Sequence, residues 1–260
     1  MGDLIKKLSR QNLPTEIEFS DSIETFKDQP RFKPYVFNYD KFRIHLDDPL
    51  AFYWETRYIF DDAIYYFETK KSKPLIIDGG ASIGVSTLYF KNMYPEARIL
   101  AFEPDLNALK YFRQNITDNN LNDIEVIERG LFNKNGAVSY QVNETDSGKI
   151  TTGGHDKILV TKLSDHLNES LDFLKLNIEG AELAVCQDLD KSGKIKLVDQ
   201  LCIEWHSFAG ESQNLDEVLY LLKKNGFRYY IASLSTAPLG RFTAKQDDQY
   251  YLMIYARRLL

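Results

Sequence analysis

Short apolar runs recur along the chain from residue 73 onward, and no other feature of the sequence constrains the fold as strongly. Seven runs are present, at residues 74–78, 98–102, 124–127, 171–176, 197–203, 227–231 and 250–255. A run without polar alternation is typical of a strand that is buried on both faces of a sheet. Most of the runs are separated by segments with helical apolar spacing, such as the one that ends at Asn225-Gly226. The alternation predicts an α/β fold with right-handed βαβ units, in which helices cover both faces of a sheet.

Two regions depart from this alternation. Residues 128–170 contain strand-like stretches at 138–142 and 158–163 around a Gly/Thr-rich loop at 146–156, without a long helix. The last two apolar runs are joined by a segment without helical spacing, so we expect them to pair as an antiparallel hairpin. The pattern predicts a seven-stranded, mostly parallel sheet with an antiparallel last strand. This is the Rossmann-like architecture of class I methyltransferases.

Aromatic residues are concentrated in the N-terminal part of the chain. Thirteen lie among the 37 residues from 31 to 67, whereas aromatic residues make up 13% of the whole chain. The rings can pack as a layer on the main core, or they can form a lid or wall over a ligand. We therefore predict an aromatic-rich N-terminal cap at residues 1–70 and a second domain at residues 71–260. The aromatic segment is also a candidate interface for a homodimer.

Composition excludes several classes of protein. The chain has 32 basic and 38 acidic residues, a net charge of −6, and no Lys/Arg cluster, which argues against binding to nucleic acid. No run approaches the ~18 apolar residues of a membrane span, and the N-terminus lacks the apolar stretch of a signal peptide. We therefore expect a cytoplasmic protein. Cys186 and Cys202 lie in apolar segments, so we expect buried thiols rather than a disulfide framework or a zinc site.

The first apolar run ends in a glycine-rich turn that is expected to precede a helix. The segment reads Asp78-Gly79-Gly80-Ala81-Ser82-Ile83-Gly84. Glycines let the backbone turn tightly and approach a ligand, and a helix N-terminus offers free N–H groups. Gly79, Ala81 and Gly84 fit a degenerate G-x-A-x-x-G pattern, which many nucleotide-binding folds share. A ligand site and a tight turn without a ligand are both compatible with these residues.

Two acidic residues indicate which ligand this turn would take. A carboxylate at Asp78 would repel the pyrophosphate of a dinucleotide, whereas S-adenosylmethionine offers an ammonium group and a sulfonium cation. Glu103-Pro104 ends the second run, 24 residues after Gly79. An acid at this position accepts hydrogen bonds from the ribose hydroxyls of either cofactor, and Pro104 suits the opening of the next helix. Asp78 therefore favours the methyl donor, and Glu103 indicates an adenosine-containing cofactor.

Four segments of the chain resemble the FkbM-type S-adenosylmethionine-dependent methyltransferases. They are Asp78 to Gly84, Phe102 to Pro104, Phe173 to Glu182 (FLKLNIEGAE) and Cys202 to His206 (CIEWH), and the resemblance covers about residues 55–232. It implies that the cofactor is held by Asp78, Gly79, Gly80, Ala81, Ser82, Gly84, Glu103, Pro104 and Asn177. Members of this family methylate hydroxyl groups, often on sugars or polyketide-type natural products. At Asn177 the family usually has Asp, and Asn keeps the hydrogen-bonding shape but loses the charge.

Polar residues follow two strands that we expect to be neighbours in the sheet. Asn177 and Glu179 follow the fourth predicted strand, and Glu204 and His206 follow the fifth. Ligands lie outside the carboxyl ends of the strands in such sheets. His206 is the first choice for a general base because its ordinary pKa is ~6.5, with Glu179 as the second choice and Glu204 orienting the imidazole. The alternatives are a structural histidine, and a divalent cation held by Asn177, Glu179 and Glu204; no metal site is predicted.

The sequence thus predicts an enzyme that transfers a methyl group from S-adenosylmethionine to a hydroxyl of a carbohydrate or another natural-product small molecule. The loops at 146–156, which include His155, and at 233–249 are candidates for acceptor recognition. Two rival interpretations remain open. One is an NAD-dependent oxidoreductase on a related Rossmann sheet, and the other is a non-catalytic homologue that retains only the cofactor site.

Overall fold

A computed structural model describes residues 14–142, 148–150, 156–208, 210–233 and 250–258. The chain forms two compact units. The first comprises Met1–Tyr66, Ser82–Pro95 and Leu106–Asn122, and the second comprises Phe67–Ala81, Glu96–Asp105 and Asp123–Leu260. The chain therefore passes between the units several times. The predicted division into a cap at 1–70 and a domain at 71–260 stays a prediction, because the units are defined by contacts and not by function.

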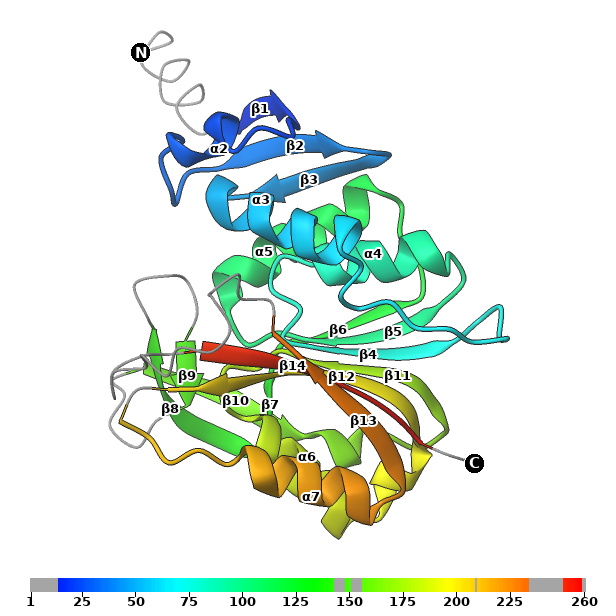
Figure 1. The fold of residues 1–260 in the computed structure, drawn as a ribbon. Coiled ribbons are helices and arrows are strands. Elements are labelled where there is room, and N and C mark those ends of the chain that lie inside the picture. The colour runs from blue at the N-terminus through cyan, green and yellow to red at the C-terminus, as the bar shows by residue number, and fades with distance from the viewer. Residues whose placement is uncertain (1–13, 143–147, 151–155, 209, 234–249, 259–260) are drawn as a thin grey trace, which may run out of the picture. The chain divides into compact units, whose positions relative to one another are not determined.

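The first unit contains a three-stranded sheet and most of the N-terminal helices. The strands are β1 (Thr15–Glu18), β2 (Tyr35–Tyr39) and β3 (Phe42–Leu46), in the order β1-β2-β3. Strand β1 is parallel to β2, and β3 is antiparallel to β2. The helices are α2 (Glu24–Lys27), α3 (Pro49–Thr56), the π-helix η1 (Arg57–Asp61), α4 (Val85–Met93) and α5 (Leu106–Asp118) (Figure 1).

Aromatic side chains form much of the core of this first unit. Phe26, Phe37 and Phe52 are at most 1% exposed, and the rings of Phe26 and Phe37 stack with centroids 5.1 Å apart. Helix α5 is fastened to β3 by Asn115, whose Nδ2 donates to the carbonyl of His45 at 3.0 Å. Seven of the thirteen aromatic residues between 31 and 67 are buried, so these rings are packed, while the choice between a layer on the main core and a lid or wall over a ligand stays open.

The second unit is built on a mixed sheet of seven strands. These are β4 (Leu75–Gly79), β5 (Arg98–Phe102), β6 (Ile124–Ile127), β11 (Leu171–Leu176), β12 (Val198–Ser207), β13 (Phe227–Ala232) and β14 (Tyr250–Arg258). Their order is β13-β14-β12-β11-β4-β5-β6. The pairs β4–β5, β5–β6, β4–β11 and β11–β12 are parallel, whereas β14 is antiparallel to both β12 and β13. All seven predicted strands are present, and the last strand lies between β12 and β13.

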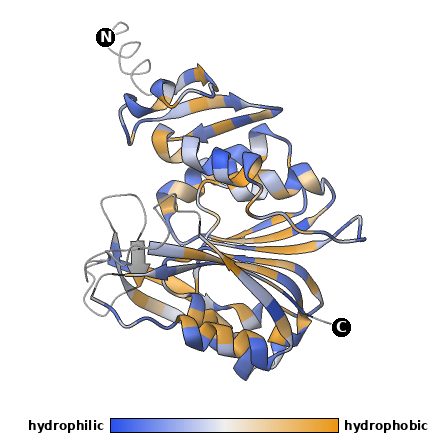
Figure 2. Cartoon of the chain, in the orientation of Figure 1, coloured by the Kyte–Doolittle hydropathy of each residue, from blue (hydrophilic) through white to orange (hydrophobic). Residues whose placement is uncertain are grey.

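Two helices pack beside each other on one face of this sheet. They are α6 (Glu182–Lys191) and α7 (Leu215–Lys224), and the short 3-10 helices η2 (Leu163–Asp165) and η3 (Lys194–Leu197) lie in the same unit (Figure 1). Val185 and Leu222 from these helices join Trp205 of β12 in one core cluster. Hydrophobic residues run along the central strands, and they alternate with hydrophilic ones along α6 and α7 (Figure 2). Because α4 and α5 belong to the first unit, the coverage of both faces of the sheet stays a prediction.

The region predicted to contain short strands forms a second sheet within the same unit. Its strands are β7 (Gly130–Phe132), β8 (Gly136–Val142), β9 (Gly148–Ile150) and β10 (Asp156–Lys162), in the order β7-β10-β8-β9. His155 and most of the loops at 146–156 and 233–249 lie outside the described residues. Cys186 and Cys202 are buried free thiols, as expected. Among the helices of the described part of the chain, none combines the length and apolar character needed to span a bilayer.

Candidate functional site

The turn after β4 packs tightly against the loop that follows β11. The backbone N–H groups of Gly80 and Ala81 both donate to the carbonyl of Phe102, at 2.9 and 3.0 Å. Gly80 has a φ of +78°, and a Cβ at this position would lie 1.8 Å from the carbonyl oxygen of Asn177. Only glycine fits between these two backbone segments. The absence of a side chain here therefore brings the glycine turn and Asn177 into direct contact.

Asp78 is fully buried at the end of β4 and has a cationic neighbour on β11. The Nζ atom of Lys175 lies 3.1 Å from Asp78 Oδ1 and donates to the carbonyl of Gly80 at 2.6 Å. A positively charged ligand would have to share the Asp78 carboxylate with Lys175. The charge of Asp78 therefore discriminates less strongly between cofactors than the sequence argument assumes, and its contact with a ligand stays a prediction.

The later residues of the glycine turn serve helix packing. Gly84 precedes α4 with a φ of +93°, and a Cβ there would lie 2.3 Å from Cδ2 of Phe112 on α5. Ser82 also has a left-handed backbone, with a φ of +49°. Ser82 and Gly84 belong to the first unit, so their part in a cofactor site stays a prediction. The G-x-A-x-x-G pattern thus contains at least one glycine that close helix packing requires.

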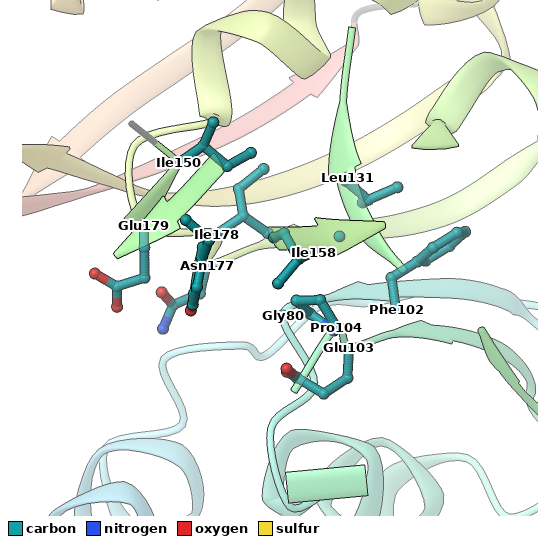
Figure 3. A pocket seen from close by; sticks show the side chains of 12 residues that line it. Gly80, Phe102, Glu103, Pro104, Leu131, Ile150, Ile158, Asn177, Ile178 and Glu179 are labelled. Carbon is teal, nitrogen blue, oxygen red and sulfur yellow. The ribbon is translucent and has the colours of Figure 1, made fainter. Parts of the chain in front are cut away.

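An open pocket of about 480 Å³ lies in the second unit. It is lined by Gly80, Phe102, Glu103, Pro104, Gly130, Leu131, Tyr140, Ile150, Ile158, Asn177, Ile178 and Glu179. The apolar side chains of Leu131, Ile158 and Ile178 lie together, while the carboxylates of Glu103 and Glu179 lie at separate edges (Figure 3). This mixture of an apolar wall and few polar groups is typical of small-molecule sites.

Four of the predicted cofactor residues line this pocket, namely Gly80, Glu103, Pro104 and Asn177. The prediction did not include the wall that β8, β9 and β10 supply, namely Tyr140, Ile150 and Ile158. Their strand-like pattern was visible in the sequence, but which side chains face the pocket depends on how the four-stranded sheet folds back. Burial raises the pKa of Tyr140 above its usual value, and the charges of the nearby acids Glu103, Asp105 and Glu179 raise it further.

Glu103 is held at the end of β5 by the backbone. Its Oε1 accepts a hydrogen bond from the N–H of Asp105 at 2.8 Å, and the residue is 7% exposed. Helix α5 begins at Leu106, so Pro104 precedes the helix rather than opening it. A fixed carboxylate on a pocket wall is suited to accept hydrogen bonds from two adjacent hydroxyls.

Asn177 connects the two strand ends. Its backbone N–H donates to the carbonyl of Gly79 at 3.1 Å, and its Nδ2 donates to Glu204 Oε2 at 3.1 Å. An aspartate at this position would place two carboxylates in contact, because it has no N–H to offer to Glu204. Asn177, which stands where the family usually has Asp, is therefore the residue that can donate a hydrogen bond to Glu204 on the neighbouring strand.

His206 lies within a group of three glutamates. Its Nδ1 is 3.1 Å from Glu182 Oε1, and its Nε2 is 3.6 Å from Glu204 Oε1 and 3.7 Å from Glu179 Oε1. Burial lowers the pKa of His206, but hydrogen bonds to Glu182 and Glu204, with the charges of Glu182 and Glu179, raise it overall to about 10. The ring is therefore an imidazolium at neutral pH and cannot accept a further proton. The choice of His206 as general base assumed an ordinary pKa of ~6.5, and that premise does not hold in the structure.

Glu179 is the member of this group that faces the pocket. Its side chain is 25% exposed, and its backbone is left-handed with a φ of +53°. Burial raises the pKa of Glu179, while His206 lowers it and Glu204 raises it. A carboxylate with a raised pKa is a stronger base than an ordinary one. In the described part of the chain, no group of three or more His, Cys, Asp or Glu side chains is arranged to hold a metal ion.

Comparison with known proteins places the chain among methyltransferases. The sequence pattern of the Methyltransferase FkbM domain matches residues 78–229. Methyltransferase 1 of Beauveria bassiana (strain ARSEF 2860) is 26% identical over 76% of this chain and 87% of that protein. Methyltransferase sdnD of Sordaria araneosa is 28% identical over 73% of this chain and 88% of that protein.

Two solved structures share the fold. The crystal structure of methyltransferase FkbM from Methylobacillus flagellatus KT superposes with a TM-score of 0.52 at 20% identity, covering 78% of this chain and 47% of that one. M. jannaschii TYW2, solved in complex with AdoMet, superposes with a TM-score of 0.51 at 14% identity, covering 89% of each chain. The seven-stranded sheet is thus that of an α/β, class I methyltransferase-like fold. Since the FkbM domain match also spans more than half of the sequence, the chain belongs to the FkbM methyltransferase family.

Proposed function

We propose that this protein is an S-adenosylmethionine-dependent O-methyltransferase that acts on a hydroxyl group of a carbohydrate or another natural-product small molecule. One observation carries the proposal. A single pocket joins an apolar wall and the fixed carboxylate of Glu103 to Glu179, which lies beside the His206 imidazolium at the ends of adjacent strands. The apolar wall and Glu103 suit an adenosine, and Glu179 beside His206 suits the transfer of a proton.

The residues of the pocket fit S-adenosylmethionine. Leu131, Ile158 and Ile178 offer an apolar surface to a purine ring, and Glu103 offers acceptors to the ribose hydroxyls. When bound, this cofactor supplies an electrophilic methyl group on a positively charged sulfur.

Glu179 is the residue that we expect to handle the acceptor's proton. A hydroxyl becomes a good nucleophile only as its proton leaves, and the Glu179 carboxylate is the base exposed to the pocket. Glu179 would accept the proton of the acceptor hydroxyl as that oxygen bonds to the methyl carbon and the carbon–sulfur bond of the donor breaks, which would leave S-adenosylhomocysteine. Burial raises the pKa of Glu179, and His206, which lies 3.7 Å from its carboxylate, acts against this rise. Glu204 holds the amide of Asn177, which would position the donor.

The charge of the site favours a neutral acceptor. Three acidic side chains, Glu179, Glu182 and Glu204, surround the single basic side chain of His206, so acidic groups are in excess here. A phosphate or carboxylate on the acceptor next to the reacting atom would be repelled by this excess. A sugar or natural-product hydroxyl carries no such charge.

The first experiment is calorimetric titration of the purified protein with S-adenosylmethionine. We expect Glu103→Ala to weaken binding at least tenfold, about 1.4 kcal/mol. Glu169→Ala is the matched control. Glu169 is an exposed acid that pairs with Arg98, and it lies before β11, at the opposite end of that strand from Asn177 and the pocket. Binding that survives Glu103→Ala unchanged would contradict the assignment of Glu103. A folded parent that binds a nicotinamide dinucleotide and not S-adenosylmethionine would overturn the proposed function.

Acceptors are then screened by the formation of S-adenosylhomocysteine. A panel of neutral sugars and hydroxylated natural products is compared with phosphorylated and carboxylated counterparts of the same compounds. Product formation with neutral members supports the proposal. Tight cofactor binding with no product from any member would instead favour a non-catalytic homologue.

A further inference from the structure

Glu182 is a buried acid whose carboxylate joins two parts of the site without lining the pocket wall described above. It is the first residue of α6 and is 1% exposed. Its Oε1 accepts a hydrogen bond from the backbone N–H of Gly180 at 3.1 Å and lies 3.1 Å from Nδ1 of His206. One oxygen atom therefore contacts both the turn after β11 and the imidazole at the end of β12.

The turn that Glu182 contacts determines where Glu179 lies. Glu179 and Gly180 both have left-handed backbones, with φ of +53° and +95°. A Cβ at Gly180 would lie 2.7 Å from the ring of Phe208, and that ring stacks on His206 with centroids 5.9 Å apart. A non-glycine residue in this conformation costs free energy, so the surrounding contacts must hold it in place. The bond from Gly180 to Glu182 is one of these contacts.

We propose that Glu182 is a positioning residue for methyl transfer, which sets the orientation and charge of His206 and, through Gly180, the place of Glu179. This inference rests on the proposed function, because it gives Glu179 the acceptor's proton. A purely structural acid at a helix start would stabilise α6 but would not control the protonation of His206.

The contacts of His206 support this role. Among the described residues, the groups that face its ring are Glu182 of α6, Glu179 of the turn, Glu204 on its own strand β12, and the rings of Phe208 and of Tyr251 on β14. Of these charged groups Glu182 is the one at Nδ1, so it fixes that proton and leaves the Nε2–H to Glu179 and Glu204. Without the charge of Glu182, His206 would lose its proton at a lower pH. Glu179 would then lose its cationic neighbour and would ionise less readily.

The test compares Glu182→Gln and Glu182→Asp with the parent. Glutamine keeps the shape and the acceptor for Gly180 but removes the charge, whereas aspartate keeps the charge but is one methylene shorter. The control is Asp188→Asn, which removes another buried carboxylate of α6, one that is bonded to Ser164. Ring titrations of His206 by NMR, calorimetric affinity for S-adenosylmethionine and pH profiles of kcat are measured on each protein.

In Glu182→Gln we expect the midpoint of His206 to fall by at least one pH unit, kcat to fall at least tenfold, and cofactor affinity to stay within threefold of the parent. The pH range of activity should narrow from both sides, and Asp188→Asn should leave the titration and the pH profile unchanged. An unchanged His206 midpoint or an unchanged pH profile in Glu182→Gln would overturn the inference, as would the same losses in the control. If Glu182→Gln does not fold, Glu182→Asp takes its place: because it keeps the charge but withdraws it by one methylene, kcat should still fall while the midpoint of His206 falls less, and an unchanged kcat would overturn the inference. A parent that binds no S-adenosylmethionine overturns the proposed function instead, and the NMR titration separates the two failures.

Discussion

Gly80 provides the sharpest test of how the glycine turn is built. Replacing it with alanine has two costs that the structure separates. The first is backbone strain, because Gly80 has a φ of +78°, and a left-handed L-residue costs about 1–2 kcal/mol. The second is a collision, because the new Cβ would lie 1.8 Å from the carbonyl oxygen of Asn177. A backbone oxygen cannot rotate away as a side chain can, so we add about 1–3 kcal/mol for overpacking.

Gly226→Ala is the matched control for Gly80→Ala. Gly226 has a φ of +82°, and its Cβ would meet nothing within 4 Å, so only the strain applies. Urea unfolding should show a loss of about 1 kcal/mol for Gly226→Ala, after the smaller entropy of the unfolded alanine chain is allowed for. Gly80→Ala should lose about 2–5 kcal/mol by the sum of the two costs, less the same entropy correction, and should also weaken binding of S-adenosylmethionine. Equal losses in the two variants would refute the close approach of the turn to Asn177.

Two further predictions concern charge. Because its pKa is raised to about 10 in the folded protein, His206 should stabilise the fold fully below pH 6.5 and lose that contribution as the pH rises to about 10. Between pH 7 and pH 9.5, the free energy of unfolding measured in urea should therefore fall more in the parent than in His206→Gln. Equal falls in the two proteins would contradict a charged His206 ring. Asn177→Asp places a carboxylate against Glu204, so the pKa of the pair should rise and the variant should lose stability as the pH increases. Urea unfolding of the variant and the parent at pH 5 and pH 8 checks this prediction. If the loss of stability in the variant relative to the parent is no larger at pH 8 than at pH 5, the contact with Glu204 is refuted.

Much of the fold could be predicted because burial leaves a mark on each segment separately. Every residue of a central strand such as β4 or β11 is buried and most of the positions are apolar, so the run is visible without knowledge of its neighbours. The same holds for the glycine turn and for the acid after β5. Asn177, Glu179, Glu204 and His206 could be placed at one edge because parallel strands end together.

The protonation of His206 could not be predicted from its own segment. Its pKa depends on distances of 3.1 to 3.7 Å to three glutamates, and two of them come from a different strand end and helix. Glu182 was visible only as the last acid of a resemblance motif, with nothing in its spacing to indicate that its side chain turns toward His206.

The sequence by itself determined which segments are strands and helices, where the glycine turn lies and which family the chain resembles. Only the tertiary structure decided that Lys175 lies beside Asp78, that the four-stranded sheet supplies a wall of the pocket, and that Glu179 faces this pocket whereas His206 lies among three glutamates. The physical reason is the range of the interactions. Apolar periodicity is a property of neighbouring residues, whereas desolvation and ion pairing depend on atoms within a few ångströms that the chain brings together only when it folds.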